Sequence, residues 1–393
     1  MNDQFRSVTN VGIGSRLVES IKGVLVGILF FLGSFPLLFW NEGRAVRRAK
    51  DLEEGRGAVV AVAAETVDPA MNGKLVHFSG AATPGGPASD PFGPSATGAL
   101  QLRRVVEMYQ WTEDRDTRRR KRAGGGERRT THYTYETEWR TDAVDSQRFE
   151  HTSGHVNPPM PFQGEAFTAP NVTVGARTLP PALVRQAEGF QPHPVAPADA
   201  PGLQRFGRPV QATGEWLYLG ANPGSPQVGD VRVKWELAPA GPVSVLAAQQ
   251  GDSVGEWTTP DGRGLEANLE RGVVSADQMF GHLEESNAIL TWVLRFVGWL
   301  LGFLGVMLVL RPLVTVADVV PFIGSIVGAG SFLAALVISL PLAAITIALG
   351  WIAYRPLVAI GVLVAGFLLF GGFGWIARAI GKRKNEARAA ARA

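Results

Sequence analysis

Two histidines in this chain have the spacing of a metal-binding pair. His151 and His155 are separated by Thr-Ser-Gly. On a helix this spacing would place both imidazole rings on one face, as in many zinc sites. The neighbouring Gly154 and Pro158 instead favour a loop, and no third ligand follows at a supporting distance. We therefore favour a surface or loop-packing position for both histidines, and predict no bound metal ion.

Three carboxylates, Glu107, Glu136 and Glu138, lie in segments that alternate between polar and apolar residues. A pair of carboxylates can perform acid–base catalysis when their separation and pKa values are matched to the reaction. Arginines on the same segments offer a simpler role, because opposite charges on neighbouring strands form ion pairs across a sheet. These arginines are Arg103, Arg104 and Arg140.

No sequence motif of an enzyme accompanies these residues. The chain contains no Gly-rich phosphate loop, no Gly-x-Ser-x-Gly and no His-Glu-x-x-His. It has no cysteine, which excludes a disulfide, a thiolate metal site and a cysteine nucleophile. We predict a protein that is not an enzyme, with no catalytic, metal-binding or cofactor-binding residue and no cofactor.

The charge distribution suggests a membrane rather than a nucleic acid. The formal net charge is +3, and basic residues gather at 44–50, 115–129 and 378–392. The first and last of these clusters adjoin apolar segments, where basic residues normally set topology or contact anionic lipid. No nucleic-acid recognition motif accompanies them, so we expect no nucleic-acid partner.

Apolar residues crowd into 23–40 and 289–380, whereas the stretch between them is polar. A helix needs about 20 apolar residues to cross the hydrocarbon of a bilayer. We predict four transmembrane helices around one large β-rich domain. The expected organisation is a cytoplasmic segment 1–22, helix 23–40, β-rich domain 41–288, helix 289–310, connector 311–325, helices 326–351 and 356–377, and a basic tail 378–393.

The polar middle of the chain contains segments with the two-residue period of half-buried strands. They are residues 74–79, 102–111, 132–140, 231–237 and 243–247. We expect 102–111 to pair with 132–140 across a solvated, mobile loop, and the last two segments to form a second hairpin.

Two stretches rich in Pro, Gly, Ala and Ser, residues 81–98 and 190–209, are expected to be surface loops. A helix is expected to start after Ser275, which has Gln278 three residues later in the pattern of a capping box. It should end at Arg311-Pro312.

Aromatic residues share one face of the first predicted hairpin. They are Tyr109, Trp111, Tyr133, Tyr135 and Trp139. A recognition surface is one interpretation, but the buried face of a sheet is the more ordinary one, which Trp216, Tyr218 and Trp235 would complete.

The predicted spans are nearly free of charge. Arg295 lies near one end of the second span, where its side chain could reach the interface. Small residues in the third span, among them Gly324, Gly328, Gly330 and Ala334, are expected to let helices pack closely.

The positive-inside rule orients the chain through its basic tail. The tail and the N-terminus are predicted to be cytoplasmic, and the β-rich domain extracytoplasmic, which in a bacterial inner membrane means the periplasm. Arg44, Arg47, Arg48 and Lys50 oppose this orientation, because they directly follow the first span on the side predicted to be outside.

Short strings of distinctive residues run through the chain from about residue 20 to 380. They include Asn-Glu-Gly-Arg-Ala after the first span, Glu-Met-Tyr-Gln-Trp and Thr-Glu-Trp-Arg in the predicted strands, and Tyr-Arg-Pro-Leu before the last span. The motif positions are Asn41, Glu42, Gly43, Arg44, Arg103, Arg104, Glu107, Tyr109, Trp111, Glu138, Trp139, Arg140, Gly154, His155, Asn157, Pro158, Gly229, Asp230, Trp351, Tyr354, Arg355 and Pro356.

In these strings the chain resembles the transmembrane protein 43 family, also called LUMA, in a bacterial-type member. The resemblance implies a four-span membrane protein. Animal members belong to the endoplasmic reticulum and inner nuclear membrane, self-associate, and help to organise envelope proteins. A bacterium has no nuclear lamina, so only the architecture, the self-association and a scaffold role can be expected here.

Three functions follow as hypotheses. The first is a non-enzymatic scaffold that forms homo-oligomers and organises membrane proteins or membrane lipid, with the strand arginines and basic tail as contact elements. The second is a channel or channel regulator. The third is a membrane-tethered enzyme or binding protein that acts on envelope lipid.

Overall fold

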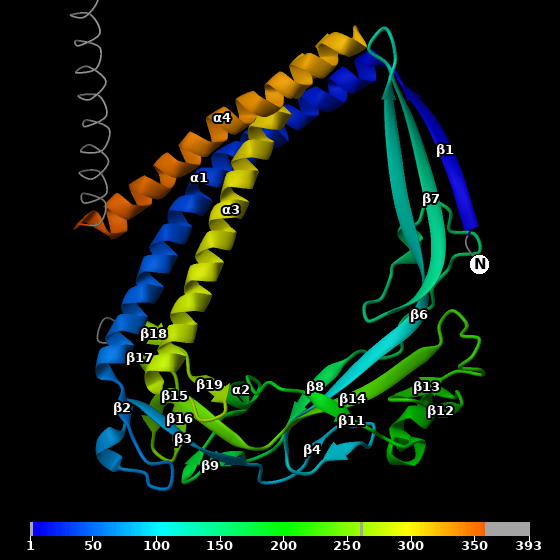
Figure 1. Ribbon diagram of the computed structural model, residues 1–393. Helices are drawn as coiled ribbons and strands as arrows, with labels where there is room; N and C mark the ends of the chain where they lie inside the picture. Colours follow the sequence, from blue (N-terminus) through cyan, green and yellow to red (C-terminus); the bar gives the residue numbers. More distant parts are fainter. Residues whose placement is uncertain (1–2, 260–261, 358–393) are drawn as a thin grey trace, which may run out of the picture. The chain divides into compact units, whose positions relative to one another are not determined.

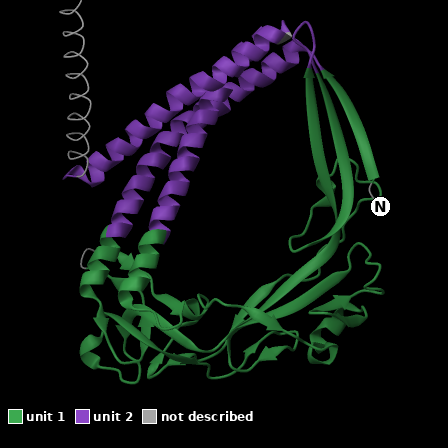
Figure 2. Cartoon of the chain, in the orientation of Figure 1, with its two compact units in different colours: residues 1–10, 50–120, 128–285 green, residues 11–49, 121–127, 286–393 purple. Residues whose placement is uncertain are grey.

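The structure is a computed structural model that describes residues 3–259 and 262–357 (Figure 1). The chain divides into two compact units, shown in Figure 2. Unit 1 comprises residues 1–10, 50–120 and 128–285, and unit 2 comprises residues 11–49, 121–127 and 286–393. The predicted fourth helix lies outside the described residues from position 358 onward, as does the whole basic tail.

Unit 1 contains most of an eight-stranded sheet, in which the main path of six strands runs β1-β7-β6-β14-β13-β12. Two further strands join it, β11 on β14 and β8 on β6. The bounds are β1 (Asp3–Val11), β6 (Ala99–Lys121), β7 (Glu127–Arg140), β8 (Glu165–Thr168), β11 (Gln191–His193), β12 (Val210–Thr213), β13 (Trp216–Leu219) and β14 (Val231–Pro239).

A second, seven-stranded sheet has the order β19-β15-β16-β10-β9-β3-β2, with β15 also pairing β3. Its bounds are β2 (Val60–Ala61), β3 (Leu75–Thr83), β9 (Thr173–Val174), β10 (Arg177–Thr178), β15 (Pro242–Gln250), β16 (Ser253–Gly255) and β19 (Asn268–Arg271). Short elements complete the unit: β4 (Ala88–Ser89), β5 (Ser95–Ala96), β17 (Trp257–Thr258), β18 (Gly264–Leu265), α2 (Pro181–Val184), and the 3-10 turns η1 (Pro69–Met71), η2 (Ser146–Arg148), η3 (Pro197–Asp199) and η4 (Pro201–Phe206).

Alternation along β14 explains its place at the centre of the first sheet. Val233 is fully buried and lies opposite Val106 of β6. The intervening Arg232 lies opposite Glu107 and pairs with it at 2.5 Å. One face of the strand therefore joins the main apolar core, while the other carries cross-strand ion pairs.

The predicted hairpin between segments 231–237 and 243–247 is wrong. β14 belongs to the first sheet and β15 to the second, and the two strands do not pair. Both edges of β14 are occupied, by β6 on one side and by β13 and β11 on the other. β15 is likewise flanked, by β3 and by β19 and β16. The short turn between them therefore carries the chain from one sheet to the next.

The hairpin of β6 and β7 is confirmed, but its strands extend through most of the predicted loop. Only residues 122–126 form the turn, and the Arg122 N–H donates to the Gly126 carbonyl at 2.8 Å. Gly124 and Gly125 adopt positive φ values of 82° and 76°, which favour glycine. The expected long mobile loop is thus a regular ribbon with a tight tip.

The two Pro- and Gly-rich stretches, residues 81–98 and 190–209, are partly buried rather than lying wholly on the surface. Asp90 and Phe92, within the first, are 4% and 3% exposed, and Leu203 in the second is fully buried. Asp90 accepts hydrogen bonds from Arg104 at 2.6 Å and from the Trp235 indole at 2.8 Å. Because Asp90 is the buried hydrogen-bond partner of Arg104 and Trp235, it holds this stretch against the sheet.

Three helices are long and apolar enough to cross a bilayer, among the residues that the structure describes. They are α1 (Ile13–Ala58), α3 (Ala276–Ala317) and α4 (Pro321–Tyr354). The capping box at Ser275 is confirmed, because its hydroxyl accepts from the Gln278 N–H at 3.3 Å. The predicted end of α3 at Pro312 is wrong, since the helix continues through this proline to Ala317.

Close packing of α1 and α3 depends on two glycines that the sequence analysis did not single out. A Cβ on Gly305 would lie 2.6 Å from the Phe31 nitrogen and 2.7 Å from the Gly27 carbonyl oxygen. By contrast, nothing lies within 4 Å of a Cβ on Gly330 in α4, which was expected to help helices pack. Small residues let these backbones touch where lipid supplies no hydrophobic driving force.

We predict that Gly305→Ala destabilises the helices, whereas Gly330→Ala does not. The added methyl group at 305 meets backbone atoms that cannot rotate away, and overpacking of this kind typically costs about 1–3 kcal/mol. Unfolding of the full chain in mixed micelles, titrated with SDS and followed by tryptophan fluorescence, measures the difference. Equal stability of the two variants would contradict the packing described.

Candidate functional site

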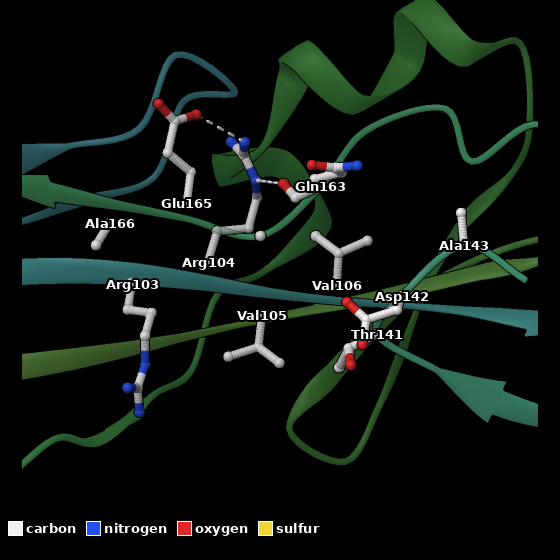
Figure 3. A pocket seen from close by; sticks show the side chains of 11 residues that line it. Arg103, Arg104, Val105, Val106, Thr141, Asp142, Ala143, Gln163, Glu165 and Ala166 are labelled. Carbon is white, nitrogen blue, oxygen red and sulfur yellow. Dashed lines mark hydrogen bonds and ion pairs between the residues drawn. The ribbon is translucent and has the colours of Figure 1, made fainter. Parts of the chain in front are cut away.

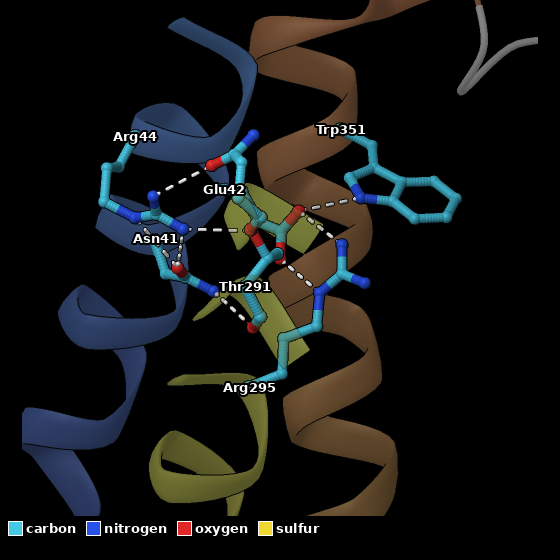
Figure 4. A network of polar contacts seen from close by, with 7 residues as sticks. Asn41, Glu42, Arg44, Thr291, Arg295 and Trp351 are labelled. Atoms are coloured by element: carbon cyan, nitrogen blue, oxygen red, sulfur yellow. Dashed lines mark hydrogen bonds and ion pairs between the residues drawn. The ribbon is translucent and has the colours of Figure 1, made fainter. Parts of the chain in front are cut away.

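A buried ion pair connects the three long helices that the structure describes in unit 2 (Figure 4). Glu42 of α1 is 1% exposed. Arg295 of α3 donates to both of its carboxylate oxygens, at 2.7 and 2.8 Å. The Trp351 indole of α4 donates to the second oxygen at 2.9 Å. Each helix thus contributes one residue to a closed set of charge-assisted hydrogen bonds.

A second layer of polar contacts continues this cluster between α1 and α3. The Asn41 amide donates to the Thr291 carbonyl at 3.0 Å. Arg44 donates to the Thr291 hydroxyl at 3.0 Å and to the Asn287 side-chain carbonyl at 2.9 Å. Asn287 in turn donates to the Ala45 carbonyl at 3.1 Å. Buried polar groups in this layer therefore satisfy one another.

Two glycines allow α4 to approach α1 at this level. A Cβ on Gly43 would lie 2.7 Å from the Tyr354 ring, and a Cβ on Gly350 would lie 2.8 Å from Cβ of Glu42. The motif around residue 42 and the motif around residue 351 are thus brought together, although they are about 300 positions apart in the sequence. We call the residues Glu42, Arg295 and Trp351 the helix clasp.

The side chain of Arg295 does not take the predicted position at the membrane interface. It points into the bundle toward Glu42, and only 14% of its side chain is exposed. Two aromatic rings also flank its guanidinium, Trp292 at 4.8 Å and Trp351 at 5.8 Å. A bidentate carboxylate is a stronger partner than a distant headgroup, which explains this orientation.

A second charged cluster lies at the other end of the apolar part of α1. Asp318, between α3 and α4, is fully buried. It pairs with Arg16 of α1 at 2.5 Å and with Lys121 of the hairpin tip at 2.6 Å. Arg16 also donates to the Gly125 carbonyl at 2.6 Å and approaches Glu127 at 3.5 Å.

These contacts do not fit the predicted topology for the hairpin tip. Residues 41–288 were assigned to one side of the membrane, and residues 1–22 and 311–325 to the other. Lys121 nevertheless contacts Asp318, and Gly125 contacts Arg16. The structure contains no membrane, so the side on which each of these segments lies stays a prediction.

In unit 1, motif residues meet where β6 leaves β14. The Asn157 side chain accepts from the Trp111 N–H at 2.7 Å and donates to the Trp111 carbonyl at 2.9 Å. The amide therefore replaces a neighbouring strand at the position where β14 has ended. A Cβ on Gly229, which has a φ of 93°, would lie 2.7 Å from the Pro158 ring.

Asp230 closes the same junction. Its carboxylate accepts from the Tyr218 hydroxyl at 2.5 Å and from the Gln227 N–H at 2.8 Å. Its carbonyl accepts from the Tyr109 N–H at 2.8 Å. The indole of Trp139 lies 5.2 Å from the Tyr109 ring. These contacts hold the ends of β13 and β14 beside β6.

Arg103 and Arg104 line an open hollow of about 440 Å³ beside β6. Figure 3 shows the two side chains pointing to opposite faces of the strand. Arg103 pairs with Glu236 at 2.5 Å. Arg104 pairs with Asp90 at 2.6 Å and with Glu165 at 3.2 Å. Both guanidinium groups are already neutralised, which leaves little positive charge for an anionic ligand.

The two histidines pack among aromatic rings and are not arranged as a metal-binding pair. His155 is 1% exposed and stacks on the Tyr135 ring at 4.0 Å. Its Nδ1 lies 3.0 Å from the His151 carbonyl oxygen, and Trp111 meets it edge-on at 4.7 Å. Phe5 of β1 stacks on the His151 ring at 4.3 Å. Among the described residues, no three His, Cys, Asp or Glu side chains form a group that could hold a metal ion.

The aromatic residues expected on one face of the hairpin differ in how deeply they are buried. Tyr133 and Tyr135 are buried, and Trp235 lies in the main core, whereas Tyr109, Trp111 and Trp139 are half-buried. The Tyr135 hydroxyl donates to Glu113 at 2.5 Å. Burial, followed by this bond to a carboxylate, raises the pKa of Tyr135 from 10.0 to about 12.

Several motif positions are not gathered into either cluster. Glu138 and Arg140 pair with each other at 3.4 Å on the surface, with about half of each side chain exposed. Gly154 adopts a φ of 84° in its loop. Arg355 ends α4, where its N–H donates to the Trp351 carbonyl at 2.7 Å, and Pro356 follows it in an exposed position.

Sequence reasoning missed Arg16, Asn287, Thr291 and Asp318 as site residues. Asp318 carried a usable signal, because it is the single acidic residue between Glu285 and Glu386. An ionisable residue within an apolar region normally has a partner or a function. Thr291 and Asn287 carried no comparable signal, since polar residues of this kind are common near the ends of spans.

We predict that Glu42→Ala lowers the free energy of unfolding by about 3–5 kcal/mol, because it leaves the Arg295 charge buried without a partner. The double variant Glu42→Ala/Arg295→Met should recover part of this loss. Glu53→Ala, on an exposed position of α1, is the matched control and should change stability by less than about 0.5 kcal/mol. The SDS titration gives all three values, and a Glu42 variant no weaker than the Glu53 variant would argue against the clasp.

Alkaline titration tests the environment of Tyr135. A folded-state pKa of about 12 exceeds the ordinary value of 10.0, so this group stabilises the fold fully below pH 10 and loses that contribution as the pH rises through 12. The difference in tyrosinate absorbance between the wild-type protein and Tyr135→Phe should therefore appear only as the pH approaches about 12. Glu113→Ala, which removes the acceptor, should move it to lower pH, and an unchanged midpoint would exclude the hydrogen bond as a cause.

Comparison with known proteins identifies the family. The family model described as Transmembrane protein 43 matches residues 108–356. Transmembrane protein 43 of Homo sapiens is 36% identical over 370 residues, which cover 91% of this chain and 90% of that protein. The protein of Rattus norvegicus is also 36% identical, over 358 residues and 88% of each chain.

A more distant relative, the transmembrane protein 43 homolog of Drosophila melanogaster, is 30% identical over 358 residues, or 87% of this chain and 91% of that protein. No solved structure matches the chain. With the three apolar helices among the described residues, these extended similarities lead to one conclusion: the chain is a multi-pass membrane protein that belongs to the transmembrane protein 43 family.

Proposed function

We propose that this protein is a non-enzymatic membrane scaffold that associates with further copies of itself and organises membrane proteins or lipids. The observation that carries the proposal is a strand ribbon in the first sheet whose outermost strand, β1, is exposed. It consists of β1, β7 and the outer half of β6. An exposed ribbon of this kind is a surface suited to pairing with another chain.

The exposure of β1 is the strongest part of this argument. Seven of its nine residues are exposed, and the other two are half-buried. Phe5 and Val8 are 38% and 40% exposed. The strand lies at the end of the sheet order, so one of its edges has no strand partner among the described residues. A nine-residue edge offers backbone donors and acceptors to a second copy.

The helices supply the other property of a scaffold, a fixed anchor in the membrane. The ionisable groups of the helix clasp neutralise one another, and at the other end Arg16 and Lys121 are balanced by Asp318 and Glu127. A transport pathway instead uses charged groups that face a water-filled cavity. Paired charges at both ends of the bundle favour rigid helices over a moving relay. A bacterial inner membrane, with most of the β-rich part in the periplasm, is the location that we propose.

Oligomeric state tests the proposal. We predict that the full chain in lipid nanodiscs forms oligomers by mass photometry, and that Val8→Lys shifts the distribution toward monomer. A lysine on an edge strand opposes pairing, because its charge would have to be desolvated in the new interface. Val156→Lys is the matched control, since Val156 is an exposed valine in a loop, at 67% exposure.

Monomers of the wild-type protein would overturn self-association. Equal effects of the two lysine variants would show that β1 is not the interface. Single-channel recording from the same preparation distinguishes the alternative, because a conductance that is lost in Glu42→Ala or Arg295→Met would favour a channel.

A further inference from the structure

The tip of the β6–β7 hairpin carries five consecutive cationic residues, Arg118, Arg119, Arg120, Lys121 and Arg122. We call residues 118–122 the basic tip. All five are exposed, with 36% of the Lys121 side chain and 80% of the Arg118 side chain accessible. Two acidic partners of this run are Asp116, 3.2 Å from Arg118, and Asp318, 2.6 Å from Lys121. The cationic side chains of this run therefore lie at the surface.

The basic tip is attached to the ends of the apolar helices. Beside the Lys121–Asp318 pair, the Gly124 N–H donates to the Val319 carbonyl at 3.1 Å. Gly125 has a φ of 76°, which favours glycine, and a Cβ there would lie 2.5 Å from the end of the Ile13 side chain. These contacts come from the first turn of α1 and from the turn between α3 and α4.

The surface beside these contacts is apolar and exposed. Val319, Val320 and Phe322 are 45%, 49% and 74% exposed. On α1, Val18 and Ile21, which follow Arg16, are each 54% exposed. Apolar side chains in this position face hydrocarbon when the helices are in a bilayer, which places Lys121 and Arg122, in the same unit, at the level of the lipid headgroups.

We propose that the basic tip binds the headgroups of anionic phospholipids, at the membrane face where α1 begins and α3 turns into α4. Cations clustered beside apolar side chains match a surface that presents phosphate above hydrocarbon. An acidic protein or a nucleic acid would leave those apolar residues in water. This inference names one lipid class for the proposed scaffold, but it does not depend on self-association.

Lipid retention tests the inference. The full chain is reconstituted into nanodiscs that contain phosphatidylcholine and phosphatidylglycerol. Native mass spectrometry then counts the lipids that remain bound to the protein after it is released from the nanodisc. Arg118→Gln/Arg120→Gln/Arg122→Gln keeps Lys121 and hence the contact with Asp318. In this triple variant we expect the ratio of retained phosphatidylglycerol to phosphatidylcholine to fall by at least about tenfold, because each basic residue near an anionic surface strengthens binding several-fold.

Arg140→Gln/Arg148→Gln/Arg185→Gln is the matched control, because it removes three exposed arginines elsewhere in unit 1. It should retain the preference. Equal retention by the two triple variants would overturn the proposal, as would displacement of the preference by inorganic phosphate at constant ionic strength. Mass photometry of the same samples reports self-association separately, so failure of lipid binding and failure of the scaffold are distinguishable.

The attachment of the tip has its own test, which the absence of native cysteine makes simple. Lys121→Cys/Asp318→Cys should be joined by a short bifunctional thiol reagent in intact membranes. Each single variant is the control, and neither should give the internal product. A double variant that does not crosslink would overturn the placement of the basic tip at the helix ends.

Discussion

The pairing of Glu42 with Arg295 is the interaction on which the helical unit depends. Two charges buried in an apolar setting are costly unless each finds its opposite in good geometry. The carboxylate meets this requirement through two bonds from Arg295 and one from Trp351. Because the three residues come from α1, α3 and α4, the need to neutralise one charge fixes the position of three helices.

Other features of the unit follow from that constraint. Gly43 and Gly350 are placed where a side chain would separate α4 from α1. Gly305 performs the same role between α3 and α1. Asp318 repeats the principle at the opposite end, where Arg16 and the hairpin tip share its charge. Polar contacts thus set the helix positions at both ends, while close backbone packing holds the apolar region between them.

In unit 1, backbone polar groups likewise need hydrogen-bond partners where a neighbouring strand ends. β14 ends beside β6, and the side chain of Asn157 then supplies the donor and acceptor that a strand would have given to Trp111. Further along, β6 and β7 continue as a ribbon that leaves the core. The exposed edge of β1 and the basic tip belong to this ribbon. The surfaces that we propose for assembly and for lipid are therefore parts of one element.

The amino-acid sequence by itself determined the division into apolar helices and a β-rich domain, because hydropathy and two-residue alternation are local properties. It also determined the capping box at Ser275 and, through its distinctive strings, the family. Tertiary structure alone decided which charges pair, which sheet receives β15, and where the basic tip lies. Glu42 and Trp351 are 309 positions apart. Partners at such distances are chosen by packing and by desolvation, and no local pattern records that choice.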